Sequence, residues 1–137
     1  MAQTVFNRYE KKYIIPEEKY MRLRRALEEH MEEDEYGRHT IYNLYYDTAD
    51  FALIRRSIDK PVYKEKLRIR SYGIPEEDST VFVEIKKKYR GVVNKRRVAM
   101  TLRQAYNYVE RGVRPVLRDP SYEDRQILNE IVFFLSH

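Results

Sequence analysis

Apolar and polar residues alternate with a period of two along three consecutive stretches in the middle of the chain. In 63–72, 80–88 and 92–101, apolar side chains recur at every second position over part of each stretch, and lysines and arginines fill many of the alternate positions. Because successive side chains of a β-strand point to opposite faces, each stretch is expected to form a strand with one apolar and one cationic face. The tight connection Tyr89-Arg90-Gly91 predicts that the last two strands form a hairpin.

The flanking residues predict two more strands and four helices. Alternation predicts a strand from Val5 to Ile15, and aromatic and β-branched residues predict another from Ile41 to Tyr46. Apolar residues at helical spacing, together with capping residues, predict the helices. They are expected after Pro16 with an apolar stripe reaching Met31, over 49–57 with Asp47 as the cap, from Thr101 with Gln104 in a capping box to Gly112, and from about Asp119 onward. The fold class is therefore α+β, an antiparallel sheet with flanking helices.

The last predicted helix carries the apolar run Ile-Val-Phe-Phe-Leu, and no later element follows that could cover it. We therefore expect residues 1–137 to be the N-terminal part of a longer domain. Exposed edge strands of such a part would tend to pair with another copy, so a homodimer is expected.

The amino-acid composition limits the classes of protein to which the chain can belong. The chain has 137 residues, 42% hydrophobic and 36% charged, which suits a single globular domain with a core. Cysteine is absent, which excludes thiol nucleophiles, disulfides and cysteine-bound zinc. No apolar run approaches the length of a membrane span, and charged residues interrupt the N-terminal segment too early for a signal peptide. A cytoplasmic location is predicted.

The positive charge is concentrated on one face of the predicted sheet. That face carries nine basic side chains against two carboxylates, an excess larger than the net charge of +5 of the whole chain. The basic residues are Arg8, Lys12, Lys66, Arg68, Arg70, Lys86, Lys88, Lys95 and Arg97, and the carboxylates are Glu10 and Glu84. Such a face favours an anionic partner.

Two interpretations of the cationic face remain open at this point. It can be the solvated side of an antiparallel sheet, which is common. However, basic side chains two residues apart on a strand lie roughly 7 Å from each other, and each such pair costs about 2 kcal/mol at an effective dielectric near 20. A bound polyanion would offset this cost, and the arginine fork and lysine point charge suit phosphate. Glu10 and Glu84 would either hold neighbouring lysines or help to hold a metal bound to phosphates.

The histidines and tyrosines say less about function than the basic residues do. His30, His39 and His137 have no neighbours at metal-ligand or triad spacing and are expected at the surface. Most of the thirteen tyrosines are expected in strands and core, although some could stack on nucleic-acid bases. No RNA-binding signature accompanies them, so nucleic acid is an improbable partner.

Five short motifs occur in an order that resembles a known family. They are Arg8-x-Glu10-x-Lys12-Tyr13, Tyr45-Tyr46-Asp47-Thr48, Lys66-Leu67-Arg68-Ile69-Arg70-x-Tyr72-Gly73, Val83-Glu84-Ile85-Lys86 and Lys95-Arg96-Arg97. In this order they are similar to the first half of the vacuolar transporter chaperone (VTC) domain. This domain is the polyphosphate polymerase branch of the CYTH-like triphosphate-tunnel superfamily.

The resemblance implies about half of a barrel whose inward side chains bind ATP and inorganic polyphosphate. By motif position, the phosphate-binding residues would be Lys12, Arg68, Arg70, Lys86, Lys95 and Arg97. Of these, Arg68, Arg70, Lys86 and Lys95 would serve catalysis, with Glu10 and Glu84 as supporting carboxylates. A divalent metal, Mn or Mg, is expected from the family. The implied activity is transfer of the ATP γ-phosphate to a growing polyphosphate chain.

Two alternatives stay open beside this phosphotransferase. One is a metal-dependent triphosphatase of the same superfamily, and the other is a module that binds polyphosphate or nucleic acid without chemistry. For residues 1–137 alone we expect weak, salt-sensitive polyphosphate binding without polymerisation.

Overall fold

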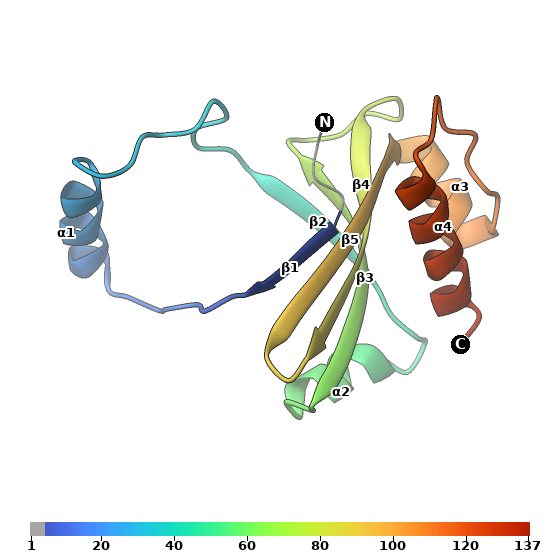
Figure 1. Ribbon diagram of the computed structural model, residues 1–137, viewed down its shortest axis with the longest axis horizontal. Coiled ribbons are helices and arrows are strands. Elements are labelled where there is room, and N and C mark those ends of the chain that lie inside the picture. Colours follow the sequence, from blue (N-terminus) through green and yellow to red (C-terminus); the bar gives the residue numbers. More distant parts are fainter. Residues whose placement is uncertain (1–4) are drawn as a thin grey trace. The chain divides into compact units, whose positions relative to one another are not determined.

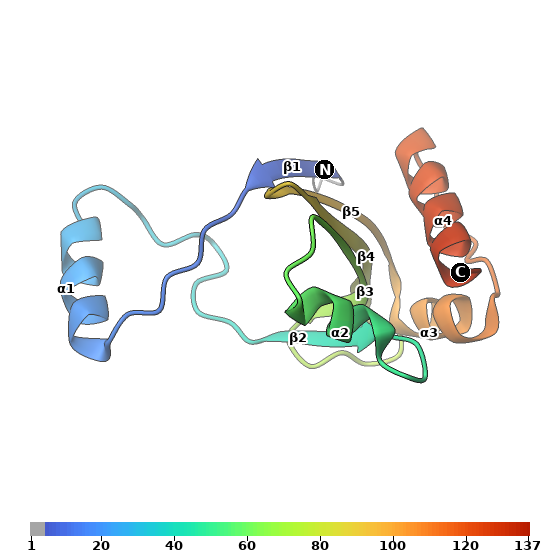
Figure 2. The ribbon, with the colours of Figure 1, turned by 90° about the horizontal axis from the view of Figure 1, so that it is seen from below.

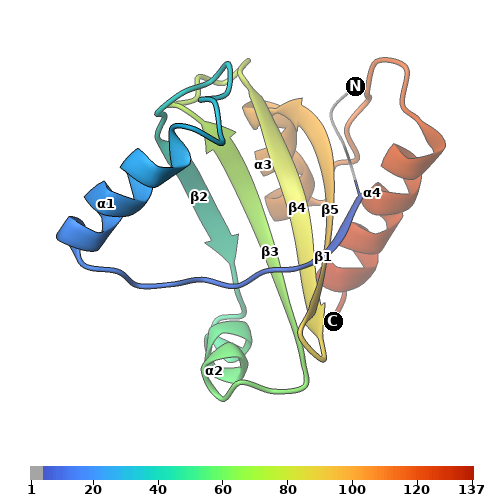
Figure 3. The ribbon, with the colours of Figure 1, turned by 60° about the vertical axis from the view of Figure 1, so that its left-hand side comes forward.

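Five antiparallel strands form one sheet in the computed structural model, which describes residues 5–137. The strands are β1 (Val5–Tyr9), β2 (Ile41–Tyr46), β3 (Tyr63–Tyr72), β4 (Thr80–Tyr89) and β5 (Val92–Thr101), and their order across the sheet is β1-β5-β4-β3-β2. Figure 1 shows the elements along the chain, and Figure 3 shows β3, β4 and β5 side by side. The sheet is curved but not closed, with β1 and β2 as its outer strands. The predicted α+β antiparallel fold is confirmed.

The β4–β5 hairpin turns over two residues. Tyr89 lies opposite Val92, and Arg90 and Gly91 both have positive φ, 47° and 83°. This combination is the one that a tight hairpin needs, because its twist matches that of the strands. Glycine at the second position adopts it at no steric cost.

Two helices cover one face of the sheet. They are α3 (Leu102–Arg111) and α4 (Tyr122–Leu135), and each begins with a capping box. Thr101 caps α3 with Gln104 as predicted, whereas α4 begins at Tyr122, three residues after Asp119, with Ser121 as its cap. Figure 2 shows both helices on the convex side of the sheet.

The hydrophobic core lies between the sheet and these two helices. The Tyr108 side chain is almost fully buried there, and its hydroxyl donates a hydrogen bond to the Leu128 carbonyl. The other core residues come from the apolar faces predicted for the central strands and from both helices: Leu67, Ile69, Val81, Val83, Ile85, Val98, Met100, Ala105, Val109, Ile127, Leu128 and Ile131. The cationic side chains therefore lie on the opposite, concave face.

Helix α2 (Ala52–Ile58) follows β2 and starts later than the predicted 49–57. Its cap residue is Phe51 rather than the predicted Asp47, although Asp47 still bonds to the first turn of the helix. The Asp47 carboxylate accepts hydrogen bonds from the backbone amides of Leu53 and Ile54 at 2.9 and 3.0 Å. Burial alone would raise the pKa of Asp47, but these bonds and that from the Thr48 amide lower it.

The prediction of a first strand reaching Ile15 is wrong. Tyr9, the last residue of β1, pairs with Val92, the first residue of β5, so β5 has no residue left to pair with Glu10 and those after it. An alternating sequence without a partner strand does not complete a ladder.

Residues Glu10–His39 form a second unit. Within it, α1 (Glu17–Leu27) follows Pro16 with acidic residues in its first turn, as predicted, but it ends before Met31. Among the described residues, no helix combines the length and the apolar character needed to cross a bilayer.

Candidate functional site

The concave side of the sheet carries what we call the basic face, a set of lysines and arginines from β1, β3, β4 and β5. Strand pairing places these side chains in rows that cross the sheet, and in several rows basic residues lie directly opposite one another. Tyr45, Asn43, Phe82, Val93 and Glu84 lie among them. The basic residues are Arg8, Lys64, Lys66, Arg68, Arg70, Lys86, Lys88, Lys95 and Arg97.

One row consists of three lysines. Lys66 of β3 pairs with Lys86 of β4, which in turn pairs with Lys95 of β5. Side chains directly opposite in neighbouring antiparallel strands have Cβ atoms about 5 Å apart, and like charges at this spacing destabilise the sheet. The row is therefore a local accumulation of positive charge that the fold itself does not favour.

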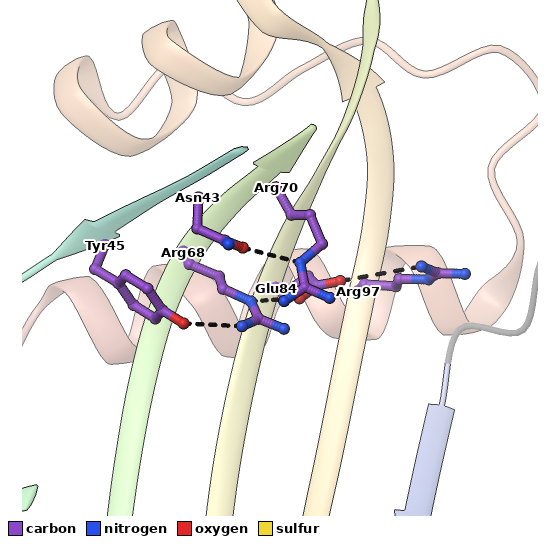
Figure 4. A network of polar contacts seen from close by, with 6 residues as sticks. All are labelled: Asn43, Tyr45, Arg68, Arg70, Glu84 and Arg97. Atoms are coloured by element: carbon purple, nitrogen blue, oxygen red, sulfur yellow. Dashed lines mark hydrogen bonds and ion pairs between the residues drawn. The ribbon is translucent and has the colours of Figure 1, made fainter. Parts of the chain in front are cut away.

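The next row holds a buried ion pair. Arg68 of β3 lies opposite Glu84 of β4, which lies opposite Arg97 of β5. Arg68 Nε donates a hydrogen bond of 2.6 Å to Glu84 Oε2, and Arg97 Nη1 is 4.0 Å from Glu84 Oε1 (Figure 4). Glu84 is fully buried and Arg68 is 6% exposed. The carboxylate thus lies between two guanidinium groups.

One carboxylate oxygen of this pair remains without a hydrogen bond. Glu84 Oε1 is buried and accepts none from the described residues, although Arg97 faces it. The Arg97 guanidinium also lies over the Phe82 ring, with Cζ 4.4 Å from the ring centre. This contact orients the planar group by cation–π attraction.

Strand β2 supplies two polar side chains that position arginines. Arg68 Nη1 donates a hydrogen bond of 2.9 Å to the Tyr45 hydroxyl, and Arg70 Nε donates one of 2.9 Å to Asn43 Oδ1 (Figure 4). Burial alone would raise the pKa of Tyr45, but the bond to Arg68 and the charges of Arg68, Lys66 and Arg70 lower it. Tyr45 therefore experiences a strongly positive field.

Lys95 of β5, on the same basic face, also experiences this positive field. Burial lowers its pKa, Glu84 opposes this, and Arg97, Arg70 and Arg8 lower it further. These arginines come from β5, β3 and β1. Charges on β5 itself, on the adjacent β1 and on β3, two strands away, therefore act on one ammonium group.

The structure brings together five of the six predicted phosphate-binding residues. Their shared placement on the basic face follows from the pairing of β3, β4 and β5. The five are Arg68, Arg70, Lys86, Lys95 and Arg97.

Lys12 and Glu10 are not on the sheet, because β1 ends at Tyr9. They belong to the second unit, where the Lys12 ammonium lies 3.4 Å from Glu10 Oε1. The contact fits the prediction that Glu10 could hold the neighbouring Lys12 in place. Glu84 instead hydrogen-bonds to Arg68, a cross-strand partner that the alternation of β4 alone did not identify.

The sequence reasoning missed Asn43 and Phe82 as parts of this site, and it noted Tyr45 only within a motif. The signal was present in the alternation of β2, since Asn43 and Tyr45 share a face. The meaning of this shared face became clear only from the pairing of β2 with β3, which places Asn43 opposite Arg70 and Tyr45 opposite Arg68.

The basic face does not fit a divalent metal held by protein ligands. Among residues 5–137, no three histidine, aspartate or glutamate side chains gather in a group that could hold one. The Glu84 carboxylate is directed at Arg68 and Arg97. Hard cations prefer several oxygen ligands, whereas guanidinium and ammonium groups bind anions. The described donors suit phosphate, and the expected Mn or Mg remains a prediction from the family resemblance.

The three predicted surface histidines fit the structure. His30, His39 and His137 are all exposed. They take no part in the basic face.

Comparison with known proteins gives one finding. The family model described as VTC domain matches residues 7–137, which is nearly the whole chain. Neither the curated proteins nor the solved structures yielded a match.

Proposed function

Because the chain belongs to the VTC domain family, we propose that its basic face binds linked phosphates, as part of a polyphosphate polymerase. The substrates would be ATP and inorganic polyphosphate. The protein carrying this domain would transfer the γ-phosphate of ATP to a growing polyphosphate chain. Residues 1–137 would be the N-terminal part of that domain.

The observation that supports this proposal best is the accumulation of positive charge across the rows. Lys66, Lys86 and Lys95 lie opposite one another, and the neighbouring row has two arginines about a single carboxylate. At an effective dielectric of 20, two like charges 8 Å apart repel by about 2 kcal/mol. A chain of phosphates, with a negative charge on each unit, would offset several such repulsions together. A single small anion would offset fewer.

The proposed reaction needs little covalent help from the protein. An oxygen of the terminal phosphate of the chain attacks the γ-phosphorus of ATP in line and forms the new P–O bond. The bond from this phosphorus to the β–γ bridging oxygen breaks, and ADP leaves with the electron pair. Positioning and stabilisation of the negative charge account for catalysis of this kind.

The basic side chains would share these tasks. Arg68 and Arg70 would hold the nucleotide phosphates, since Tyr45 and Asn43 already fix their guanidinium groups. The transferring and product phosphates would lie against Lys86, Lys95 and Arg97.

The proposal can be tested with adjacent lysines of β4. Lys86 lies on the basic face, whereas Lys87 lies opposite Glu65 and Asn94 on the other face. Isothermal titration calorimetry with inorganic tripolyphosphate would compare Lys86→Ala with the matched control Lys87→Ala. A hydrogen bond to a charged group contributes roughly 1.5–3 kcal/mol, so Lys86→Ala should raise the Kd about tenfold or more. Lys87→Ala should change it less than twofold.

Equal losses for both variants, or no binding by the unchanged chain, would contradict the proposal. Raising the salt concentration should weaken binding strongly, because screening reduces the attraction between exposed charges. For the protein that carries the domain, incubation with ATP would separate the reaction classes. Polymer formation supports the transferase, and release of free phosphate alone would indicate the triphosphatase instead.

A further inference from the structure

A small apolar pocket adjoins the basic face where β2 ends and α2 begins. Its volume is about 360 Å³, within the range of small-molecule sites, and its surface is mainly apolar. Phe51, Leu53 and Ile54 line it from the α2 side, and Tyr45 and Lys66 line it from the sheet. Figure 3 shows α2 beyond the end of β2 and beside β3.

Two of these residues belong to the basic face as well. The Tyr45 ring lines the pocket and also lies near two cations, with the Lys66 ammonium 5.7 Å and the Arg68 guanidinium 5.8 Å from its centre. Lys66 is also the β3 member of the row of three lysines. The pocket is therefore continuous with the surface proposed to hold phosphates, with no intervening element.

The backbone at Phe51 has an unusual conformation. Its φ is 59°, a left-handed conformation that is costly for a bulky residue, and the residue is 61% exposed. The Phe51 amide donates a hydrogen bond of 2.9 Å to the Thr48 carbonyl, and Asp47 accepts two from the next turn. These bonds fix the backbone that carries an exposed aromatic ring in the lining of the pocket.

We propose that this pocket holds the nucleobase of a nucleoside triphosphate whose phosphates lie on the basic face, an inference that rests on the proposed function. A base is flat and largely apolar on its faces, which suits the Tyr45 and Phe51 rings and the Ile54 side chain. Its triphosphate carries the negative charge that Lys66 and Arg68 attract. Inorganic polyphosphate has no group for this pocket, so the pocket distinguishes the nucleotide from the polymer.

The test compares ATP with inorganic tripolyphosphate, which carries a similar phosphate chain without a base. In Phe51→Asn the ring is removed, but asparagine tolerates positive φ, so the loop is preserved. The second variant is Ile54→Ser, and the matched control is Ile58→Ser, at an exposed position of the same helix outside the pocket lining. Stacking of a base on an aromatic side chain corresponds to roughly 5- to 150-fold in Kd.

We expect Phe51→Asn and Ile54→Ser to raise the Kd for ATP at least fivefold and to leave that for tripolyphosphate within twofold. Ile58→Ser should change neither. If the unchanged chain binds tripolyphosphate and the pocket variants bind ATP normally, the nucleobase pocket is refuted while the phosphate site stands. If the unchanged chain binds neither compound, the phosphate site fails, and the pocket assignment fails with it. Equal weakening of both compounds by the pocket variants would also overturn the pocket assignment, because it indicates a general loss of structure.

Discussion

Replacing Glu84 by glutamine should destabilise the protein and yet strengthen its binding of polyphosphate. The carboxylate is fully buried, bonded to Arg68 at 2.6 Å and 4.0 Å from Arg97. At an effective dielectric of 20, a pair of opposite charges 4 Å apart attracts by about 4 kcal/mol. Removing one partner of a buried pair costs about 3–5 kcal/mol, because the other charge remains buried and uncompensated.

Glutamine keeps a neutral acceptor for Arg68, so we expect the lower end of this range, a loss of about 3 kcal/mol. For a domain of this size the melting temperature should fall by about 10 °C. Removal of the negative charge also removes a repulsion toward phosphate, so the Kd for tripolyphosphate should fall roughly threefold or more. Tripolyphosphate should therefore raise the melting temperature of the variant more than that of the unchanged chain.

The assays are urea unfolding followed by circular dichroism and calorimetric titration with tripolyphosphate. The control is Glu130→Gln, which breaks the Arg96–Glu130 pair on the helix-covered face. Both side chains of that pair are about a quarter exposed, so the loss should stay below about 1 kcal/mol with no change in binding. Unchanged stability and unchanged affinity of Glu84→Gln would refute the view that this carboxylate compensates charge on a phosphate-binding face.

Two further predictions concern the same field. Lys95→Met should raise the unfolding free energy at neutral pH by up to about 1 kcal/mol, because it removes a cation that other cations surround. It should also weaken the binding of tripolyphosphate. Urea denaturation measures the stability and calorimetric titration the affinity, and a destabilised variant with normal binding would contradict the prediction. Tyr45 should ionise below the ordinary pKa of 10.0, whereas partial burial and the hydrogen bond to Glu65 raise the pKa of Tyr63 to about 12. The folded state then loses the Tyr45 proton first, so this group contributes stability that increases with pH up to about 10. Tyr45→Phe should lack the earliest-ionising part of the tyrosinate absorbance below pH 10, and a titration curve identical to that of the unchanged chain would contradict the prediction.

Much of the fold could be read from local patterns. Alternation in 63–72 and 92–101 predicted β3 and β5 with their observed bounds, and it assigned the apolar side chains of the central strands to the core. The capping box at Thr101 and Gln104 marked the start of α3. These features depend on neighbours a few residues apart, which the sequence displays directly.

Which residues meet in the site depends on the pairing between strands, and this pairing is harder to predict from the sequence. The two-residue turn at Arg90-Gly91 fixes the β4–β5 register and hence places Glu84 opposite Arg97. No comparable constraint exists between β3 and β4, because a loop of seven residues joins them, 73–79. The contact between Arg68 and Glu84 therefore required the tertiary structure.

Side-chain alternation is a property of a single strand, so the amino-acid pattern alone predicts that basic side chains share one face of each central strand. Three features of the site required the folded chain: Glu84 is buried between two arginines, β2 brings Asn43 and Tyr45 to them, and β1 stops at Tyr9 before Glu10 and Lys12. Register, burial and strand length depend on the partner strand, whose position is set by packing between distant segments of the chain.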